Sequence, residues 1–322
     1  MQAKTVLVTG AAGFIGSHSV DRLLALGHRV IGLDNFASGK RENLHRAQQS
    51  PRFTLVEGDV TDGAILTQLF ERESLDGVLH LAALVSVPRS FADPEGNARL
   101  NLYATDQLAR LCVRYSCLRL VFASSAAVYG DGQELPSRET ALPQPTSPYG
   151  AAKLAGENML LGYGESFGLQ AVCLRYFNIY GPRQDPSSPY SGVLSIFAHR
   201  HRNREVIKVY GDGEQSRDFV SVKDVAGINV HGLVGDAVIP GRYNVCTGRA
   251  VSLNRILAVF REIYPEAPAP LYCEPRVGDI RHSLGDPSRL EAMLGINAQV
   301  SLEEGLRALV IADGLPGEAA VV

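Results

Sequence analysis

The first 35 residues of the chain form one strand–helix–strand unit with a glycine-rich turn at its centre. A short apolar run (4–9) ends in Gly10-Ala11-Ala12-Gly13-Phe14-Ile15-Gly16, a helical pattern follows, and a second apolar run (29–33) ends in Asp34-Asn35. Glycines at this spacing let the backbone approach a pyrophosphate, which lies at the positive N-terminus of the following helix. The unit predicts a dinucleotide site, with Gly10, Gly13, Phe14, Ile15 and Gly16 in contact with the cofactor.

An acidic residue closes this unit. Asp34 is placed to accept hydrogen bonds from an adenosine ribose, which favours NAD over NADP as the cofactor. A loop carboxylate that merely stabilises its own turn is the alternative interpretation.

The alternation of strand and helix then continues. Apolar runs at 53–57, 78–81, 118–123 and 170–174 predict further strands, and 100–114 predicts a helix. Repeated units of this kind give an α/β fold, a doubly wound parallel sheet of the Rossmann type with right-handed crossovers. Ligands of such sheets lie beyond the carboxyl ends of the strands. The residues that follow these strand ends, and that we therefore expect around the cofactor, include Asp59, Val60, Leu81, Ala82 and Ala83.

A tyrosine and a lysine four residues apart stand at a predicted helix start, in Ser147-Pro148-Tyr149-Gly150-Ala151-Ala152-Lys153. Side chains at i and i+4 share one helical face, so the ammonium of Lys153 can favour the phenolate of Tyr149 and lower its pKa. We predict that the pair accepts a proton from a hydroxyl group. The spacing alone also fits a solvated helix start, but Ser125 and 175–178 are expected at the same edge of the sheet.

The local composition of the sequence changes after Asn178, where Gly- and Pro-rich loops begin. We predict an NAD-binding domain over 1–178 and 218–247, and a smaller, C-terminal substrate domain over 179–217 and 248–322. Arg217 and Arg276 emerge from such loops and suit bidentate recognition of a diphosphate. Two surface arginines in turns would give the same pattern.

Composition narrows the class of partner. Net charge is −3, with 31 basic and 34 acidic residues well mixed, so neither nucleic acid nor a membrane surface is an expected partner. No long apolar span or signal peptide is evident. The 5 cysteines are scattered and lack metal-ligand spacing, which fits reduced thiols in a cytoplasmic protein without a metal site.

With these residues assembled, the chain resembles the extended short-chain dehydrogenase/reductase family, and within it the NAD-dependent UDP-hexose 4-epimerases. The motifs that carry this resemblance are specific in combination. They are the Gly10/Gly13/Gly16 triplet, His80-Leu81-Ala82-Ala83, Ser124-Ser125-Ala126-Ala127-Val128-Tyr129-Gly130, Tyr149 with Lys153, Leu174-Arg175-Tyr176-Phe177-Asn178, Gly211-Asp212-Gly213 with Arg217-Asp218, and Arg276-Val277-Gly278-Asp279.

The resemblance implies a role for each matching residue. Tyr149 is the implied base, Lys153 holds the nicotinamide ribose and lowers the pKa of the tyrosine, and Ser125 is the hydroxyl partner. Ser124 is the weaker candidate, because family alignment counts back from 128–130. Implied cofactor contacts are the glycine turn, Asp34, Asn35, Asp59, Val60, Leu81, Ala82, Ala83, Tyr149, Lys153 and Tyr176. Implied substrate contacts are Ser86, Ser125, Tyr149, Asn178, Val193, Tyr210, Arg217, Arg276, Asp279 and Ser283.

The implied reaction is redox-neutral: C4 of a UDP-hexose is oxidised to a ketone, the sugar turns about its diphosphate link, and the hydride returns to the opposite face. Related 4,6-dehydratases need an Asp-Glu pair after the hydroxyl residue. Ala126 and Ala127 stand there, which disfavours dehydration. A net dehydrogenase and a catalytically idle NAD-binding protein are the remaining alternatives.

The choice of hexose depends on the position four residues after Asp279. Ser283 stands there, and in the resemblance a small residue leaves room for an N-acetyl group, as in the UDP-N-acetylglucosamine 4-epimerase subgroup. Ala127 departs from that subgroup, so a dual-specificity enzyme or a strict UDP-glucose 4-epimerase stays open. The resemblance also implies a homodimer in which helices 100–114 and 153–167 pair into a four-helix bundle; the alternative is that they merely cover the sheet.

Overall fold

A seven-stranded parallel sheet forms the larger part of the protein, whose computed structural model describes residues 2–131, 134–186, 192–275 and 280–312. The strand order is β10-β6-β5-β4-β1-β2-β3. Apolar residues dominate most of these strands because both faces of a parallel sheet are covered by helices. Their bounds are β1 (Thr5–Thr9), β2 (Arg29–Asp34), β3 (Phe53–Glu57), β4 (Gly77–His80), β5 (Arg119–Ser125), β6 (Gln170–Tyr176) and β10 (Gly241–Val245).

Helices pack on both faces of this sheet. Successive residues of a strand point to opposite faces, and β1 accordingly sends Val6 and Val8 into one buried apolar cluster and Leu7 into another. On the side of Val6 lie α1 (Phe14–Ala25), α2 (His45–Gln48), α9 (Val222–Val234) and α11 (Ser288–Leu294). On the side of Leu7 lie α3 (Gly63–Arg72), α6 (Ala104–Arg114) and α7 (Pro148–Phe167).

Short helical segments connect these layers. One of them, η2, is π-helical and leads directly into α6. Their bounds are η1 (Arg41–Leu44), α4 (Val87–Ala92), α5 (Pro94–Ala98), η2 (Arg99–Tyr103) and η3 (Ala126–Val128).

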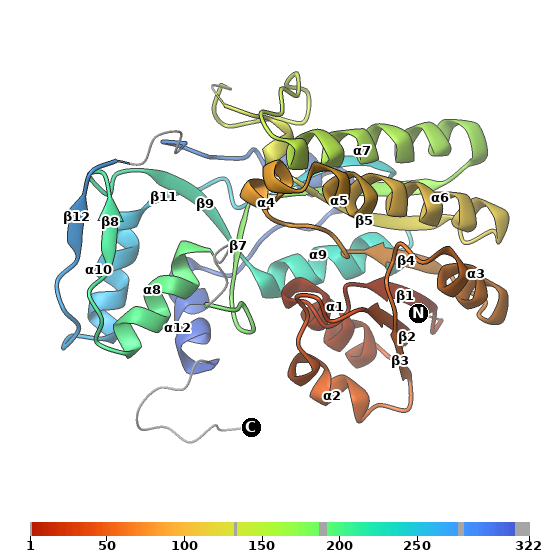
Figure 1. Ribbon diagram of the computed structural model, residues 1–322, viewed down its shortest axis with the longest axis horizontal. Coiled ribbons are helices and arrows are strands. Elements are labelled where there is room, and N and C mark those ends of the chain that lie inside the picture. The colour runs from red at the N-terminus through yellow and green to blue at the C-terminus, as the bar shows by residue number, and fades with distance from the viewer. Residues whose placement is uncertain (1, 132–133, 187–191, 276–279, 313–322) are drawn as a thin grey trace.

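A smaller lobe with its own apolar core occupies the left half of Figure 1, beside the large sheet. Its strands form a three-stranded sheet, β11-β9-β7, and a two-stranded sheet, β12-β8. The elements of this lobe are β7 (Asn178–Tyr180), α8 (Val193–Arg202), β8 (Lys208–Tyr210), β9 (Ser216–Ser221), β11 (Ala250–Ser252), α10 (Leu253–Ile263), β12 (Leu271–Cys273) and α12 (Leu302–Ala312).

The predicted doubly wound α/β fold is confirmed. Strand β10 was not anticipated as a strand, although it lies within the stretch assigned to the larger domain. The exact domain boundaries stay a prediction. Within the described residues, no helix is both long and apolar enough to cross a membrane, and no group of three or more His, Cys, Asp or Glu side chains could hold a metal ion.

Candidate active site

The glycine turn packs closely against the carboxyl end of β4. Gly10 follows β1 with φ +70°, and a Cβ on it would lie 2.8 Å from the backbone nitrogen of Ala82. A Cβ on Gly16 would overlap the carbonyl oxygen of Gly10. Helix α1 begins at Phe14 after Gly13, which provides no side-chain cap. The first N–H groups of α1 are therefore uncapped by a side chain, as an anion-binding helix start requires.

Asp34 lies at the end of β2 and is 7% exposed. Its carboxylate accepts hydrogen bonds from the backbone N–H of Ala12 (2.8 Å), inside the glycine turn, and of Phe36 (2.8 Å). A carboxylate has about four acceptor positions, so these two bonds leave capacity for a ribose hydroxyl. Both readings of this residue, turn stabiliser and ribose acceptor, are compatible with the geometry.

A second carboxylate follows β3. Asp59 accepts a hydrogen bond from Asn35 (2.8 Å) and two from Thr61. Burial acts to raise the pKa of Asp59, but the hydrogen bonds from Thr61 and Asn35 outweigh it and the pKa is lowered. Val60, next along the chain, is buried. Asp34, Asn35 and Asp59 are thus brought together at the ends of neighbouring strands.

The loop after β4 is fixed by a buried histidine that the sequence analysis did not assign to the site. The N–H groups of Leu81 and Ala82 donate to the Thr9 hydroxyl, which also contacts Nδ1 of His80 at 2.8 Å. Nε2 of His80 contacts the Thr105 hydroxyl at 3.1 Å. Burial and the nearby charge of Lys153 lower the pKa of His80 to about 3. The histidine is therefore neutral and ties β1, β4 and α6 together.

Tyr149 and Lys153 lie in the first turns of α7, as predicted. Ser147 caps this helix by accepting a hydrogen bond from the N–H of Gly150 (3.1 Å), and Pro148 occupies its first position, where proline is preferred. Lys153 is 2% exposed. Its Nζ lies 5.8 Å from the centre of the Tyr149 ring and 4.8 Å from that of Phe122 on β5.

Ser125 and Ser124 end β5 and point to different partners. Ser125 caps η3 through the N–H of Ala127 and forms a hydrogen bond with Tyr149, which acts to lower the tyrosine pKa. Ser124 instead donates to Glu157. The structure thus brings Ser125, and not Ser124, to the phenol, in line with the preference for Ser125.

The expectation that Lys153 lowers the pKa of Tyr149 is wrong for the protein without a bound ligand. Burial raises the pKa of Tyr149, and the opposing cause is the hydrogen bond with Ser125. Burial also lowers the pKa of Lys153 to about 7, against the raising effect of Glu157. A desolvated lysine carries its positive charge less readily, so it is a weaker counter-charge for a phenolate than its helical spacing suggests.

The end of β6 and the start of β7 supply two further residues of the predicted site. Tyr176 is buried, and its hydroxyl donates to Asn229 on α9 at 2.6 Å. Asn178 donates through Nδ2 to the carbonyl of Asp218 at 3.2 Å. Hydrogen bonds to neighbouring elements of the protein hold both side chains in place.

The predicted substrate residues come from α4 and from the small lobe. Ser86 caps α4, and Ser90 in that helix accepts a hydrogen bond from the N–H of Tyr149 (3.2 Å), so α4 and the start of α7 are joined. Val193 begins α8 and Tyr210 ends β8.

Arg217 lies on β9, and the segment that contains Ser283 runs beside the start of this strand. The Ser283 N–H donates to the carbonyl of Ser216 (3.0 Å), and Arg217 donates to the carbonyls of Ser216 and Arg281. The remaining two predicted contacts, Arg276 and Asp279, lie outside the described residues.

Glu157 is the main residue near the site that the sequence analysis missed. It is fully buried in α7, one turn beyond Lys153, and pairs with Arg175 on β6 at 2.7 Å. The repeated spacing of four from Tyr149 to Lys153 to Glu157 is the signal that could have found it, because i and i+4 side chains share a helical face.

This chain's residues fit a dinucleotide. The close contact of Gly10 with Ala82, the overlap that a Cβ on Gly16 would cause, and the uncapped start of α1 together form a cradle for a phosphate group. Asp34 retains acceptor capacity at the neighbouring strand end. We therefore propose that the pyrophosphate lies at the glycine turn and the adenosine side at Asp34, Asn35 and Asp59.

Comparison with known proteins also indicates an NAD-dependent family. A family model described as NAD dependent epimerase/dehydratase family matches residues 6–246. A UDP-glucose 4-epimerase of Mycolicibacterium smegmatis is 40% identical over 93% of this chain and 95% of its own length. The structure of a UDP-N-acetylglucosamine 4-epimerase from Methanobrevibacter ruminantium, in complex with UDP-N-acetylmuramic acid, superposes with a TM-score of 0.92 at 38% identity, covering 97% of this chain and 99% of that one. A Thermus thermophilus UDP-glucose 4-epimerase in complex with NAD gives 0.85 at 39% identity, covering 96% and 99%.

Proposed function

This chain belongs to the NAD dependent epimerase/dehydratase family, and on that premise we propose that it inverts C4 of a UDP-hexose, chiefly UDP-N-acetylglucosamine and UDP-N-acetylgalactosamine. The observation that carries the proposal is the meeting of Ser125, Tyr149 and Lys153 at the same sheet edge as the glycine turn. The relatives named above are UDP-sugar 4-epimerases, which supports the reaction type.

NAD, when bound, supplies a hydride acceptor that gives the hydride back. Tyr149 takes the proton of the C4 hydroxyl as hydride leaves, and later returns it. The hydrogen bond between Ser125 and Tyr149 directs the phenol oxygen and favours its ionised form. Lys153, buried behind the ring, offers a positive charge to the same end of the site.

The absence of an acid beside Ser125 argues against dehydration. Ala126 and Ala127 occupy the two following positions. The closest buried carboxylate along α7, that of Glu157, is fully occupied by hydrogen bonds from other side chains. No proton can therefore be moved at C5 or C6 by these groups, and inversion at C4 is the reaction that they support.

The test of this function is incubation of the purified protein, without added cofactor, with UDP-N-acetylglucosamine and separately with UDP-glucose. We expect conversion of the first to its C4 epimer without accumulation of NADH. Build-up of NADH would indicate a net dehydrogenase, and no conversion of either sugar would leave a nucleotide-binding protein. A faster reaction with UDP-glucose would reverse the substrate assignment, as the name of the Mycolicibacterium relative suggests.

The substrate preference is proposed to depend on the small side chain of Ser283. Its backbone is held on β9 through the carbonyl of Ser216, so its position is fixed by the sheet. We expect Ser283→Tyr to lower kcat/KM for UDP-N-acetylglucosamine by about tenfold or more relative to UDP-glucose, because a phenol ring would occupy the space of an N-acetyl group.

Competition between the two sugars in one reaction measures this ratio directly. Ser283→Ala is the matched control, since it changes the same residue but keeps it small, and it should retain the ratio of the unmodified protein. An unchanged preference in Ser283→Tyr would place the gate elsewhere.

We further propose that two copies of the chain assemble through α6 and α7, which pack side by side. Tyr103, just before α6, is 64% exposed and Phe167, at the end of α7, is 58% exposed, so apolar surface remains on these helices for a partner copy. Sedimentation equilibrium distinguishes a dimer from the 34.7 kDa monomer.

A further inference from the structure

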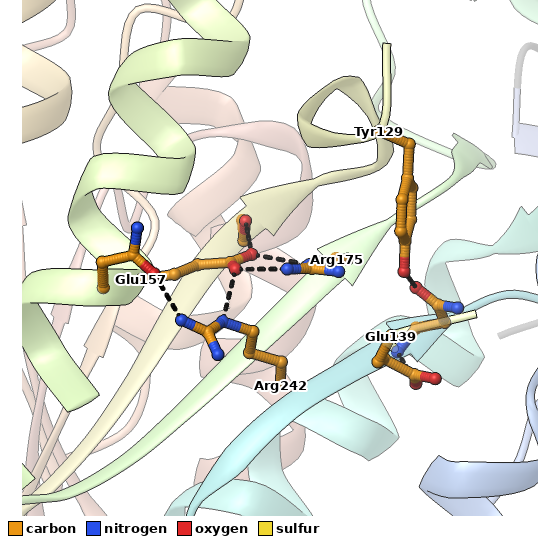
Figure 2. A network of polar contacts seen from close by, with 8 residues as sticks. Tyr129, Glu139, Glu157, Arg175 and Arg242 are labelled. Atoms are coloured by element: carbon orange, nitrogen blue, oxygen red, sulfur yellow. Dashed lines mark hydrogen bonds and ion pairs between the residues drawn. The ribbon is translucent and has the colours of Figure 1, made fainter. Parts of the chain in front are cut away.

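A buried carboxylate on α7 joins the ends of three strands. Glu157 is 0% exposed, and both of its oxygens accept two hydrogen bonds. Oε1 accepts from Ser124 on β5 and from Nε of Arg175 on β6 (2.9 Å); Oε2 accepts from Nη2 of Arg175 (2.7 Å) and from Nε of Arg242 on β10 (2.9 Å). Figure 2 shows the two guanidinium groups converging on this carboxylate.

The donors around Glu157 match a carboxylate. Two guanidinium groups and one hydroxyl fill its acceptor positions, the arrangement typical of a charge-assisted cluster. Arg175 is 1% exposed and also lies over the Tyr129 ring, with 4.8 Å between Cζ and the ring centre. The Tyr129 hydroxyl in turn donates to Asn244 on β10 at 2.6 Å (Figure 2).

The same carboxylate lies on the reacting face of α7. Tyr149, Lys153 and Glu157 follow one another at intervals of four, so they form a row along the helix. Ser124, which donates to Glu157, directly precedes Ser125 in β5. Strand β5 pairs with β6 at this point, so that Ser124 lies opposite Arg175 and Ser125 opposite Tyr176. Two of the three partners of Glu157 therefore directly precede a residue of the candidate active site: Ser124 precedes Ser125, and Arg175 precedes Tyr176.

We propose that Glu157 is a positioning residue for the C4 inversion: its carboxylate fixes the rotation of α7 against β5 and β6, and its negative charge keeps the buried Lys153 in the ammonium form. This inference rests on the proposed function. A purely structural ion cluster, with no influence on Lys153, is the alternative that the experiment must exclude.

The surroundings of Lys153 leave this role to Glu157. Burial lowers the pKa of Lys153, and the charge of Glu157 raises it. His80 on β4 is neutral and so adds no charge. The elements packed against α7 also carry charged groups: Arg89 on α4, Glu95 on α5, Arg99 on η2, Asp106, Arg110 and Arg114 on α6, Arg119 on β5, Arg175 on β6, and Asp93 between α4 and α5. Among the described residues, Glu157 is the one whose charge moves the pKa of Lys153.

Two variants separate the charge of Glu157 from its packing. Glu157→Gln removes the charge and keeps an acceptor for Ser124, but it leaves the Arg175 cation buried without a counter-ion, which destabilises a fold strongly. The double variant Glu157→Gln with Arg175→Met removes both buried charges and leaves only Arg242, which is 30% exposed and can be solvated. Glu165→Gln is the control, the same change on an exposed position of the same helix.

The primary measurement is the titration of Lys153 by NMR of lysine-labelled protein as purified, with kcat recorded over the same pH range. In the double variant we expect Lys153 to titrate at a lower pH, by less than the roughly two pH units that one unit charge at about 6 Å supplies with an effective dielectric of about 20, because the Arg175 cation is lost together with the Glu157 anion. Above about pH 8, kcat should fall roughly tenfold for each unit of that shift and recover as the pH is lowered. The Glu165→Gln protein should match the unmodified one.

Three results would overturn the proposal. They are an unshifted Lys153 titration in the folded double variant, a loss of kcat that is equal at every pH, and failure of the double variant to fold, which would assign the cluster to stability alone. If the unmodified protein converts no UDP-sugar, the proposed function fails, and the NMR titration still tests the effect of Glu157 on Lys153.

Discussion

Tyr149→Phe is expected to lower kcat by about 10²- to 10⁴-fold, the range that a positioned proton acceptor contributes. The substitution removes the one oxygen that can take the C4 hydroxyl proton and keeps the ring that packs near Lys153. It breaks one side-chain hydrogen bond, that with Ser125, so the thermal stability should change by about 1 kcal/mol or less. Initial rates, circular-dichroism melting and NAD content of the purified protein measure these effects.

Tyr163→Phe is the matched control for this substitution. It makes the same chemical change on the same helix, and the lost hydroxyl donates to Asp106 on α6 at 2.9 Å, away from the site. Turnover should stay close to that of the unmodified protein. If Tyr149→Phe kept its turnover as well, the phenol would have no part in the reaction.

Lys153→Met is expected to make the NAD-free protein more stable and the enzyme inactive. Burial lowers the pKa of Lys153 from the ordinary lysine value of 10.5 to about 7. A difference of that size corresponds to about 5 kcal/mol of unfavourable free energy when the charged lysine is buried. Methionine fills similar space without a charge, so a stabilisation of a few kcal/mol should follow.

The stabilisation has a defined pH dependence. Below the folded-state pKa of about 7, lysine is protonated in both the folded and the unfolded chain, and the whole cost is present. Between 7 and 10.5 the unfolded chain binds more protons, so the stability of the unmodified protein rises with pH and the advantage of Lys153→Met shrinks. Urea unfolding at several pH values, on protein from which NAD has been removed, measures the difference.

Lys208→Met is the control for this prediction, because Lys208 is exposed on β8. The free energy of unfolding of the Lys208→Met protein should not show the pH-dependent gain that is expected for Lys153→Met. Two outcomes would contradict the argument: no gain in stability for Lys153→Met at neutral pH, or a gain that stays constant towards pH 10.5.

Local sequence patterns were sufficient for most of the fold. The run 53–57 became β3 with the same bounds, and the tyrosine–lysine segment became the start of α7 because Ser147 and Pro148 are a cap and a first-turn residue. Strand β10 was missed, since Gly241–Val245 contains polar residues whose burial depends on α7 and on the segment at 137–139. Such partners are distant in sequence and leave no periodic signal.

The candidate site was predictable where it depends on strand ends. Ser125 and Asp34 end their strands and Ala82 follows one, and the structure places all three at one edge of the sheet. The two serines of β5 could not be separated by spacing, because their directions are set by Glu157 and Tyr149, which come from a helix later in the chain.

The sequence by itself determined the glycine turn, the parallel sheet and the helical row that begins with Tyr149, because each of these depends on neighbours within a few residues. Only the tertiary structure decided the charge state of that row. Burial beneath β5 and β6 lowers the pKa of Lys153 and raises that of Tyr149; the charge of Glu157 opposes the first effect, and the hydrogen bond with Ser125 opposes the second. Desolvation is produced by all the elements packed around a group at once, so it cannot be derived from spacing along one helix.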